Sequence, residues 1–160
     1  MPQLFYCLYR PARMAVVFVY GTLTDPERLS AVLEHYQLGP PAVCEGLQRV
    51  DGTYPTLAPG GAVDGRLLAT PQLAELDAYE GLDQGLYCRL SVPLSTGETQ
   101  NAVDSVFRTA SAELYVGNPS LLDVSESIEW PDSGPFDQRV RSYIEAQSVH
   151  IRLVVTENSD

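Results

Sequence analysis

The sequence predicts one α+β domain, a small and mainly antiparallel β-barrel-like fold with a few short helices. Short apolar runs recur along the chain and are separated by turn-forming residues, while only a few segments show helical periodicity. With 160 residues, 44% of them hydrophobic, the chain is long enough to bury one core. We expect residues 15–160 to form the domain and residues 1–14 to be an N-terminal extension.

The first predicted strand leads into a glycine loop. Residues 15–20 (AVVFVY) are β-branched and aromatic without alternation, which predicts a buried strand. Residues 21–24 (GTLT) form the loop, and residues 25–27 (DPE) open a helix. Because such a loop presents backbone N–H groups at a strand end, it can hold a carboxylate or an oxyanion.

The helix after this loop is predicted from an amphipathic stripe. Thr24 and Glu27 have the spacing of a capping box, and residues 39–41 (GPP) are expected to end the helix. The apolar positions of the stripe are Leu29, Val32, Leu33 and Tyr36.

The middle of the chain reads as strands with turns between them. Residues 42–50, 54–57 and 63–70 are predicted strands, the second at an edge because of Pro55. Gly60 and Gly61 are expected to reverse the chain between the second and third of these strands.

The second half alternates helices and strands. Residues 72–79 predict a short helix stopped by Gly81. Residues 87–94 and 102–109 predict two strands around a Ser-Thr-Gly-Glu turn, and residues 113–116 predict another strand. A polar loop over residues 125–136 contains Trp130, and it precedes a helix over 136–147 and a strand over 151–155.

The charge of the chain is unusual, with a net charge of −11 and ten basic residues that are all Arg. Such an acidic surface repels nucleic acid and anionic membranes, so we expect neither as a partner. An acidic, lysine-free composition suggests a halophilic source, where salt screens self-repulsion. The rival explanation, a GC-rich genome, accounts for the absent Lys but not for the acid excess. No apolar run approaches the length of a membrane span.

The three cysteines, Cys7, Cys44 and Cys88, are widely spaced and form neither a CxxC pair nor a ligand cluster with the histidines. We therefore expect reduced, mostly buried thiols in a cytoplasmic protein, without a metal site. The motifs GxxxxGK[ST], GxGxxG and GxSxG do not occur, so nucleotide binding and a serine nucleophile elbow have no support.

Glu80 is the candidate proton-transfer residue. Leu73, Leu76 and Glu80 fall on one stripe of the predicted helix over 72–79, so the carboxylate projects where an apolar face is expected. An inward carboxyl loses solvation and its pKa rises, which suits a general acid and base near neutral pH. Two other readings stay open: Glu80 points to solvent at a frayed helix end, or it pairs with Arg89. Asp77 is the second candidate acid.

Several short motifs together resemble the γ-glutamylcyclotransferase-like superfamily, and most closely its AIG2-like and γ-glutamylamine cyclotransferase branch. They occur in the same order and with suitable spacing between residues 16 and 116, so the combination is specific although each motif alone is weak. The motifs are YGTL at residues 20–23, YPTL at 54–57, VDGRL at 63–67, LDAYEG at 76–81 and YCR at 87–89.

The resemblance implies a barrel-like fold with a cavity at its mouth and a small-molecule γ-glutamyl substrate. It implies cyclisation of the γ-glutamyl group to 5-oxoproline without a metal or cofactor, with Glu80 as general acid and base. Tyr87 and Tyr115 are expected to line the cavity, or else to pack in the core. By the same resemblance the substrate is bound largely through backbone groups of Tyr20, Gly21, Thr22 and Leu23.

Two alternatives remain within the same fold. One is a non-catalytic binding or interaction module, and the other is a tailoring enzyme that removes a γ-glutamyl group during biosynthesis. Selectivity for the leaving group is expected from loops at residues 59–62 and 83–86 and around Trp130.

Overall fold

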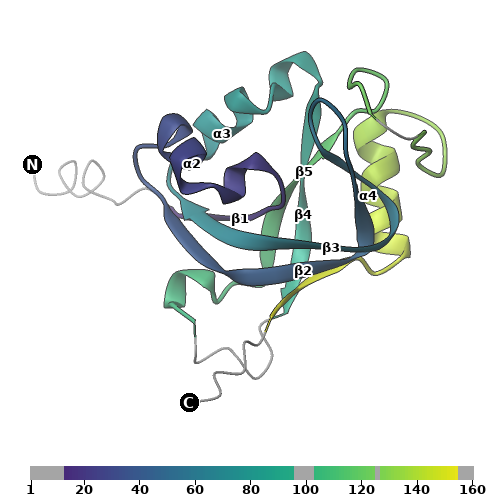
Figure 1. Ribbon diagram of the computed structural model, residues 1–160. Helices are drawn as coiled ribbons and strands as arrows, with labels where there is room; N and C mark the ends of the chain where they lie inside the picture. The colour runs from purple at the N-terminus through teal and green to yellow at the C-terminus, as the bar shows by residue number, and fades with distance from the viewer. Residues whose placement is uncertain (1–12, 96–102, 125–126, 155–160) are drawn as a thin grey trace, which may run out of the picture.

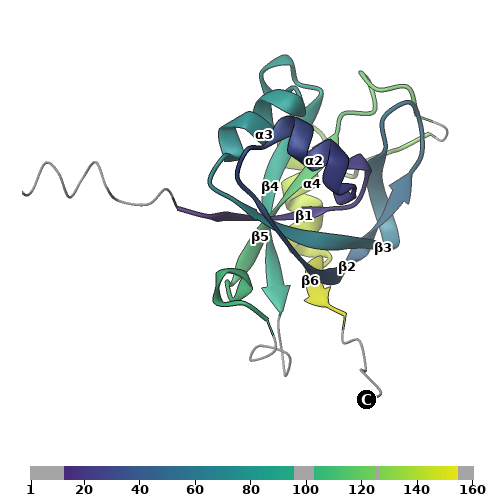
Figure 2. The ribbon, with the colours of Figure 1, turned by 60° about the vertical axis from the view of Figure 1, so that its left-hand side comes forward.

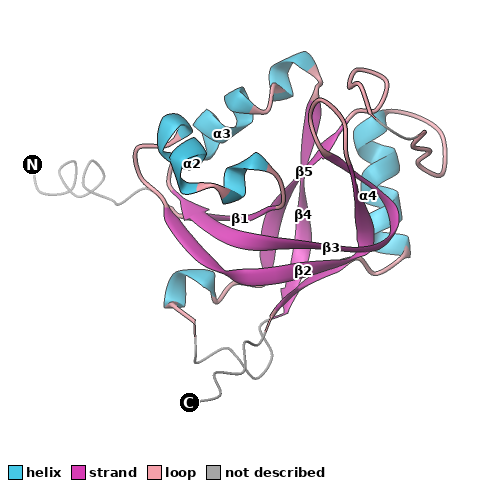
Figure 3. Cartoon of the chain, viewed as in Figure 1, coloured by secondary structure: helices cyan, strands magenta, loops and turns pink. Residues whose placement is uncertain are grey.

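The computed structural model describes residues 13–95, 103–124 and 127–154, whose strands form a closed barrel (Figures 1 and 3). Around the barrel the order is β1-β3-β2-β6-β4-β5. Four neighbouring pairs are antiparallel, whereas β1–β5 and β4–β6 are parallel, which confirms the predicted fold class. The strands are β1 (Ala15–Val19), β2 (Gln37–Val50), β3 (Thr56–Thr70), β4 (Tyr87–Ser95), β5 (Ser111–Gly117) and β6 (His150–Leu153).

Helices cover the barrel on two sides (Figures 1 and 2). The helices α2 (Pro26–Val32) and α3 (Leu73–Tyr79) contact each other on one side, and α4 (Phe136–Ala146) packs against β4 on another. None of the described helices is long and apolar enough to cross a membrane. Short 3-10 helices are η1 (Thr22–Thr24), η2 (Leu82–Gln84) and η4 (Ser105–Phe107).

Strand β1 is buried on both faces, which explains why its sequence does not alternate. Val16 and Phe18 face the barrel interior, where they join the larger apolar cluster. Val17 and Val19 face outward and join a second cluster beneath α2 and α3. Because the outer cluster fixes both helices against β1, it sets the position of the loop that follows β1.

The first helix ends earlier than its sequence predicts. α2 stops at Val32, and β2 already begins at Gln37, so the expectation that residues 39–41 end the helix is wrong. The prolines fit in the strand because the β2–β3 register shifts between Leu38 and Pro41. The capping box was also predicted wrongly, since the N-cap is Asp25, whose side chain accepts from the backbone N–H of Glu27.

The predicted strands over 54–57 and 63–70 are one continuous strand, so the expected reversal at Gly60 and Gly61 is wrong. β3 runs through both glycines, which have φ values of +102° and +66°. They lie opposite Gly46, at a register shift in the pairing with β2. Positive φ values at this point bend the long hairpin instead of closing it.

The predicted strand over 102–109 is not a strand where the structure describes it, because residues 105–107 form η4. Its Phe107 is fully buried in the barrel and lies against Gly39. The next strand, β5, instead begins at Ser111 and pairs with β4. The apolar residues Val103, Val106 and Phe107 thus pack with the barrel core without forming a strand.

Other expected elements are present with small differences in their bounds. β4, α3, α4 and the strand at 113–116 agree with prediction, and Gly81 ends α3 in the left-handed conformation with φ +68°. Cys44 is buried and Cys88 half-buried, both as free thiols. The extension up to residue 12 with Cys7, the turn at 96–98, residue 102, residues 125–126 and residue 155 lie outside the described part.

Candidate active site

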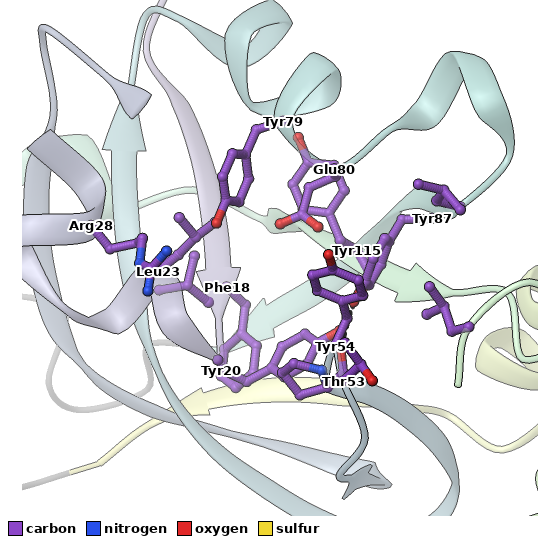
Figure 4. A pocket seen from close by; sticks show the side chains of 15 residues that line it. Phe18, Tyr20, Leu23, Arg28, Thr53, Tyr54, Tyr79, Glu80, Tyr87 and Tyr115 are labelled. Atoms are coloured by element: carbon purple, nitrogen blue, oxygen red, sulfur yellow. Dashed lines mark hydrogen bonds between the residues drawn. The ribbon is translucent and has the colours of Figure 1, made fainter. Parts of the chain in front are cut away.

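One end of the barrel holds a cavity of about 530 Å³ (Figure 4). Its walls come from the end of β1, the loop before β3, the end of α3, the start of β4 and the end of β5. The lining residues are Phe18, Val19, Tyr20, Gly21, Leu23, Arg28, Thr53, Tyr54, Pro55, Tyr79, Glu80, Leu86, Tyr87, Tyr115 and Leu122.

Glu80 is the C-cap of α3 and points its carboxyl group into this cavity, above Tyr115 (Figure 4). Leu76, one turn earlier, is fully buried, and Glu80 lies on the same inward face of the helix. Burial raises the pKa of Glu80 from 4.5 to about 7. Its side chain makes no hydrogen bond or ion pair with any residue in the described part of the chain.

The alternative pairing of Glu80 with Arg89 is not what the structure shows. Arg89 instead binds Asp77, with Nε 2.8 Å from Oδ1 and Nη2 3.2 Å from Oδ2. The remaining guanidinium nitrogen, Nη1, contacts the carboxylate of Glu113 on β5. Asp77, the second candidate acid, is therefore held in an ion pair, while Glu80 faces the cavity.

The loop after β1 is fixed on both sides. The Tyr20 hydroxyl donates to the carbonyl of Tyr115 at 2.6 Å, and the Tyr20 carbonyl accepts from Arg49 Nη1 at 2.8 Å. The carbonyl of Gly21 accepts from the backbone N–H and the hydroxyl of Thr24, at 3.1 and 2.8 Å. The bond from the Thr24 N–H is the helical bond of η1, so the N–H groups of Thr22 and Leu23, at the start of this helix, have no helical acceptor.

Three of the four predicted loop residues, Tyr20, Gly21 and Leu23, line the cavity, and Thr22 begins η1. The contact between Gly21 and Pro55 explains why a residue without a side chain occupies position 21. A Cβ atom there would lie 3.1 Å from Cγ of Pro55, so a larger residue would push the loop before β3 away.

Tyr87 and Tyr115 form cavity walls with their rings, while their hydroxyl groups bind the protein. The Tyr87 hydroxyl donates to the carbonyl of Pro55 at 2.7 Å, and the Tyr115 hydroxyl donates to Asp77 Oδ1 at 2.7 Å. Burial raises the pKa of both phenols, so they are neutral donors at physiological pH. The aromatic walls supply the low-polarity surroundings of Glu80.

Some cavity residues were given no role from the sequence. Tyr54 and Tyr79 line the mouth with 59% and 45% of their surface exposed, and Arg28 adds a cation from α2. Tyr54 and Tyr79 lie inside the YPTL and LDAYEG motifs, which was the available signal. Nothing in the sequence pattern marks Arg28 as a cavity residue.

The loops expected to select the leaving group are placed differently. Residues 59–62 form the bend of the β2–β3 hairpin, and of residues 83–86 only Leu86 is among the lining residues. Trp130 is buried in the barrel core, edge-on to Phe136 and Tyr143. The residues that line the mouth of the cavity are instead Arg28, Tyr54 and Tyr79.

Among the described residues, no group of three or more His, Cys, Asp or Glu side chains is arranged to hold a metal ion. The polar groups of the described cavity residues are thus one carboxyl group of raised pKa, neutral phenols, backbone N–H groups and one guanidinium. This set is suited to proton transfer on a polar substrate with an anionic group.

Solved structures share this fold at low identity. A protein of Arabidopsis thaliana is 23% identical, with 86% of this chain and 91% of that chain covered and a TM-score of 0.51. A structure named gamma-glutamyl cyclotransferase is 17% identical over 83% of this chain and 79% of that chain, with a TM-score of 0.53. An uncharacterized protein of Homo sapiens is 17% identical over 84% and 80%, with a TM-score of 0.54.

No curated protein sequence matches the chain significantly. A family model does match, and it is described as gamma-glutamyl cyclotransferase, AIG2-like. The match extends over residues 17–137, which include the last three residues of β1, the loop after it, α3 with Glu80, and the cavity-lining part of β5. The chain therefore belongs to the AIG2-like gamma-glutamyl cyclotransferase family.

Proposed function

We propose that this protein cyclises a γ-glutamyl group to 5-oxoproline and releases the attached amine or amino acid. The observation that carries the proposal is the Glu80 carboxyl, which faces the cavity without a charged partner among the described residues and has a pKa of about 7. Family membership supports the reaction class.

The reaction needs a proton acceptor before the bond can form. The α-amine of the substrate is an ammonium group near pH 7, since the pKa of an α-amine is about 8. In our proposal the Glu80 carboxylate accepts a proton from this ammonium, and the free amine attacks the γ-carbonyl carbon. A carboxyl with a pKa near that of the working pH is suited to accept a proton and to return it.

The second half of the reaction breaks the original amide bond. The tetrahedral intermediate carries a negative oxygen, and loop N–H groups are suited to stabilise it. Glu80, now protonated, donates to the departing nitrogen as the bond from that nitrogen to carbon breaks. The regenerated Glu80 carboxylate then accepts the extra proton of the ring nitrogen, which becomes the lactam N–H, and passes this proton to the released amine. The products are 5-oxoproline and the amine in its ammonium form, and water is not consumed.

The loop after β1 is assigned to the glutamyl end of the substrate. We place the substrate α-carboxylate at the backbone N–H groups of Gly21, Thr22 and Leu23, because these groups make no helical hydrogen bond at the start of η1. Binding this carboxylate and the carbonyl together folds the flexible glutamyl chain toward ring closure, which lowers the entropic barrier. Arg49 and Thr24 support the loop from behind.

A substrate panel tests the proposal. The protein is incubated with γ-glutamyl amines, γ-glutamyl dipeptides and glutathione, at low and high salt, and 5-oxoproline is quantified. We expect release from at least one substrate class. Binding of γ-glutamyl compounds without any 5-oxoproline would instead identify a binding module of the same fold and refute the enzymatic proposal.

A further inference from the structure

Among the described residues that line the cavity, one side chain is basic, the guanidinium of Arg28. The chain has no Lys and a net charge of −11, so basic side chains are outnumbered by acidic ones. Every other ionisable lining group is a phenol or the carboxyl of Glu80. A lone cation in such a cavity provides one binding position for a substrate anion.

Arg28 has no protein partner among the described residues, whereas most of the described arginines have one. Arg66 donates to the carbonyl of Gly39, and Arg152 pairs with Glu45 at 2.9 Å. Arg28 makes no hydrogen bond or ion pair within the described ranges, and its side chain is exposed to the cavity mouth. The guanidinium is therefore available to an incoming ligand.

Arg28 offers a binding position distinct from the backbone N–H groups of the loop after β1, although it lies on the same side of the cavity as the loop residue Leu23. It lies on α2, on the side of the cavity formed by Leu23 and across from Tyr87 (Figure 4). Under the proposed function, the N–H groups of the loop hold the α-carboxylate of the glutamyl group, and Glu80 faces the nitrogen atoms. A second carboxylate, on the leaving group, then remains for Arg28.

We propose that Arg28 binds a carboxylate of the leaving group, so that the protein prefers γ-glutamyl conjugates of amino acids to γ-glutamyl conjugates of simple amines. This inference rests on the proposed function. A guanidinium binds a carboxylate through two parallel hydrogen bonds, which a single ammonium does not reproduce. Arg28 is a specificity-determining residue in this account and takes no part in proton transfer.

Matched substrates that differ by one carboxylate test the inference. γ-Glutamyl-alanine is compared with γ-glutamyl-ethylamine, and γ-glutamyl-4-aminobutyrate with γ-glutamyl-propylamine. For at least one pair we expect Arg28→Gln to lower kcat/KM of the acidic substrate by about fivefold to tenfold, the range of a charge-assisted hydrogen bond at a partly solvated site. The amine substrates should change by less than about twofold. Arg28→Lys should restore only part of the loss.

Arg141→Gln is the control for charge, since Arg141 is an exposed residue of α4 that pairs with Asp137 at 4.0 Å and does not line the cavity. It removes the same charge far from the cavity and should leave every ratio unchanged. If Arg28→Gln slows the acidic and amine substrates equally, Arg28 binds the α-carboxylate that all of them share, and the inference is wrong. Unchanged ratios in both pairs would also overturn it.

Binding measurements keep the two proposals distinguishable. Dissociation constants for the same compounds are measured by calorimetry in the Glu80→Gln background, with and without Arg28→Gln. If the wild type releases no 5-oxoproline, the proposed reaction fails, yet a selective loss of affinity for the acidic compound in Arg28→Gln still supports the carboxylate site. Equal affinities in both backgrounds refute it.

Discussion

Glu80 lies one helical turn after the fully buried Leu76, and this placement points its carboxyl group into the cavity. Desolvation raises the pKa of its carboxyl from 4.5 to about 7, and no nearby cation offsets this effect. Between these two pH values the folded protein binds more protons than the unfolded chain. The free energy of unfolding contributed by Glu80 is therefore greatest below pH 4.5 and is lost as the pH rises through about 7.

A stability measurement checks this sign. Replacing Glu80 with Gln removes the ionisation, so wild type and Glu80→Gln should have similar Tm values at pH 4. At pH 8 the variant should be the more stable by about 2 kcal/mol, a value reduced from the full shift because the group is partly solvated. Glu75→Gln, at an exposed position of the same helix, is the control. An equal difference between wild type and Glu80→Gln at both pH values would contradict the account.

At the scale of elements, Gly81 joins α3 to η2 and so fixes the direction of Glu80. Its φ is +68°, and a Cβ atom would lie 2.8 Å from Cδ1 of Leu86. Gly81→Ala should therefore cost about 1–3 kcal/mol in unfolding free energy and lower activity, because the strained link moves the neighbouring carboxyl.

Gly85 provides the matched control for this substitution. Its φ is +75°, but the nearest atom to a Cβ there is 3.9 Å away. Gly85→Ala carries the backbone strain without the clash, so denaturant unfolding should show a loss of about 1 kcal/mol, smaller than that of Gly81→Ala. Equal losses in stability and activity for the two variants would show that contact with Leu86 has no effect.

The ion pairs of Arg89 connect α3 to β4 and β5. Replacing Arg89 with Met leaves the carboxylates of Asp77 and Glu113 without their shared cation, and their repulsion should destabilise the fold by about 1–3 kcal/mol at pH 7. Arg89→Lys keeps a cation at this position and should recover part of the loss. Thermal unfolding of both variants at pH 7 measures this. Equal losses in Arg89→Met and Arg89→Lys would show that the positive charge is not what Arg89 contributes.

Local sequence patterns predicted the helices and strands that an apolar run or an amphipathic stripe defines. The other elements depend on contacts with residues distant in the sequence. β1, α3 and α4 agree with prediction because an uninterrupted apolar run or a helical stripe is enough to define each. The sequence also predicted the inward direction of Glu80 from its spacing to Leu76. The continuity of β3 through Gly60 and Gly61 depends on Gly46 of the partner strand, which no local pattern contains. The place of Arg28 in the cavity lining was not predictable either, because it depends on how α2 packs against the barrel.

At the scale of the whole molecule, the net charge of −11 opposes compaction. Salt screens such repulsion, with a Debye length of about 10 Å at 0.1 M. We expect the Tm to rise as NaCl increases from about 0.01 to 0.3 M, where screening is the main effect of the salt. Scanning calorimetry at pH 7, with sucrose as a neutral co-solvent control, measures the rise. A Tm that stays constant over this range would show that the surface charges are too dispersed to matter.

The central claim is that Glu80 transfers the protons of γ-glutamyl cyclisation, and the pH dependence of 5-oxoproline release tests it most directly. For a substrate identified by the panel, kcat/KM of the wild type should rise with pH through about 7, as the carboxyl ionises to the base. Glu80→Gln, folded as judged by its Tm, should lose about a hundredfold or more of this activity. Activity within a few-fold of wild type in Glu80→Gln, with the same pH profile, would contradict the claim.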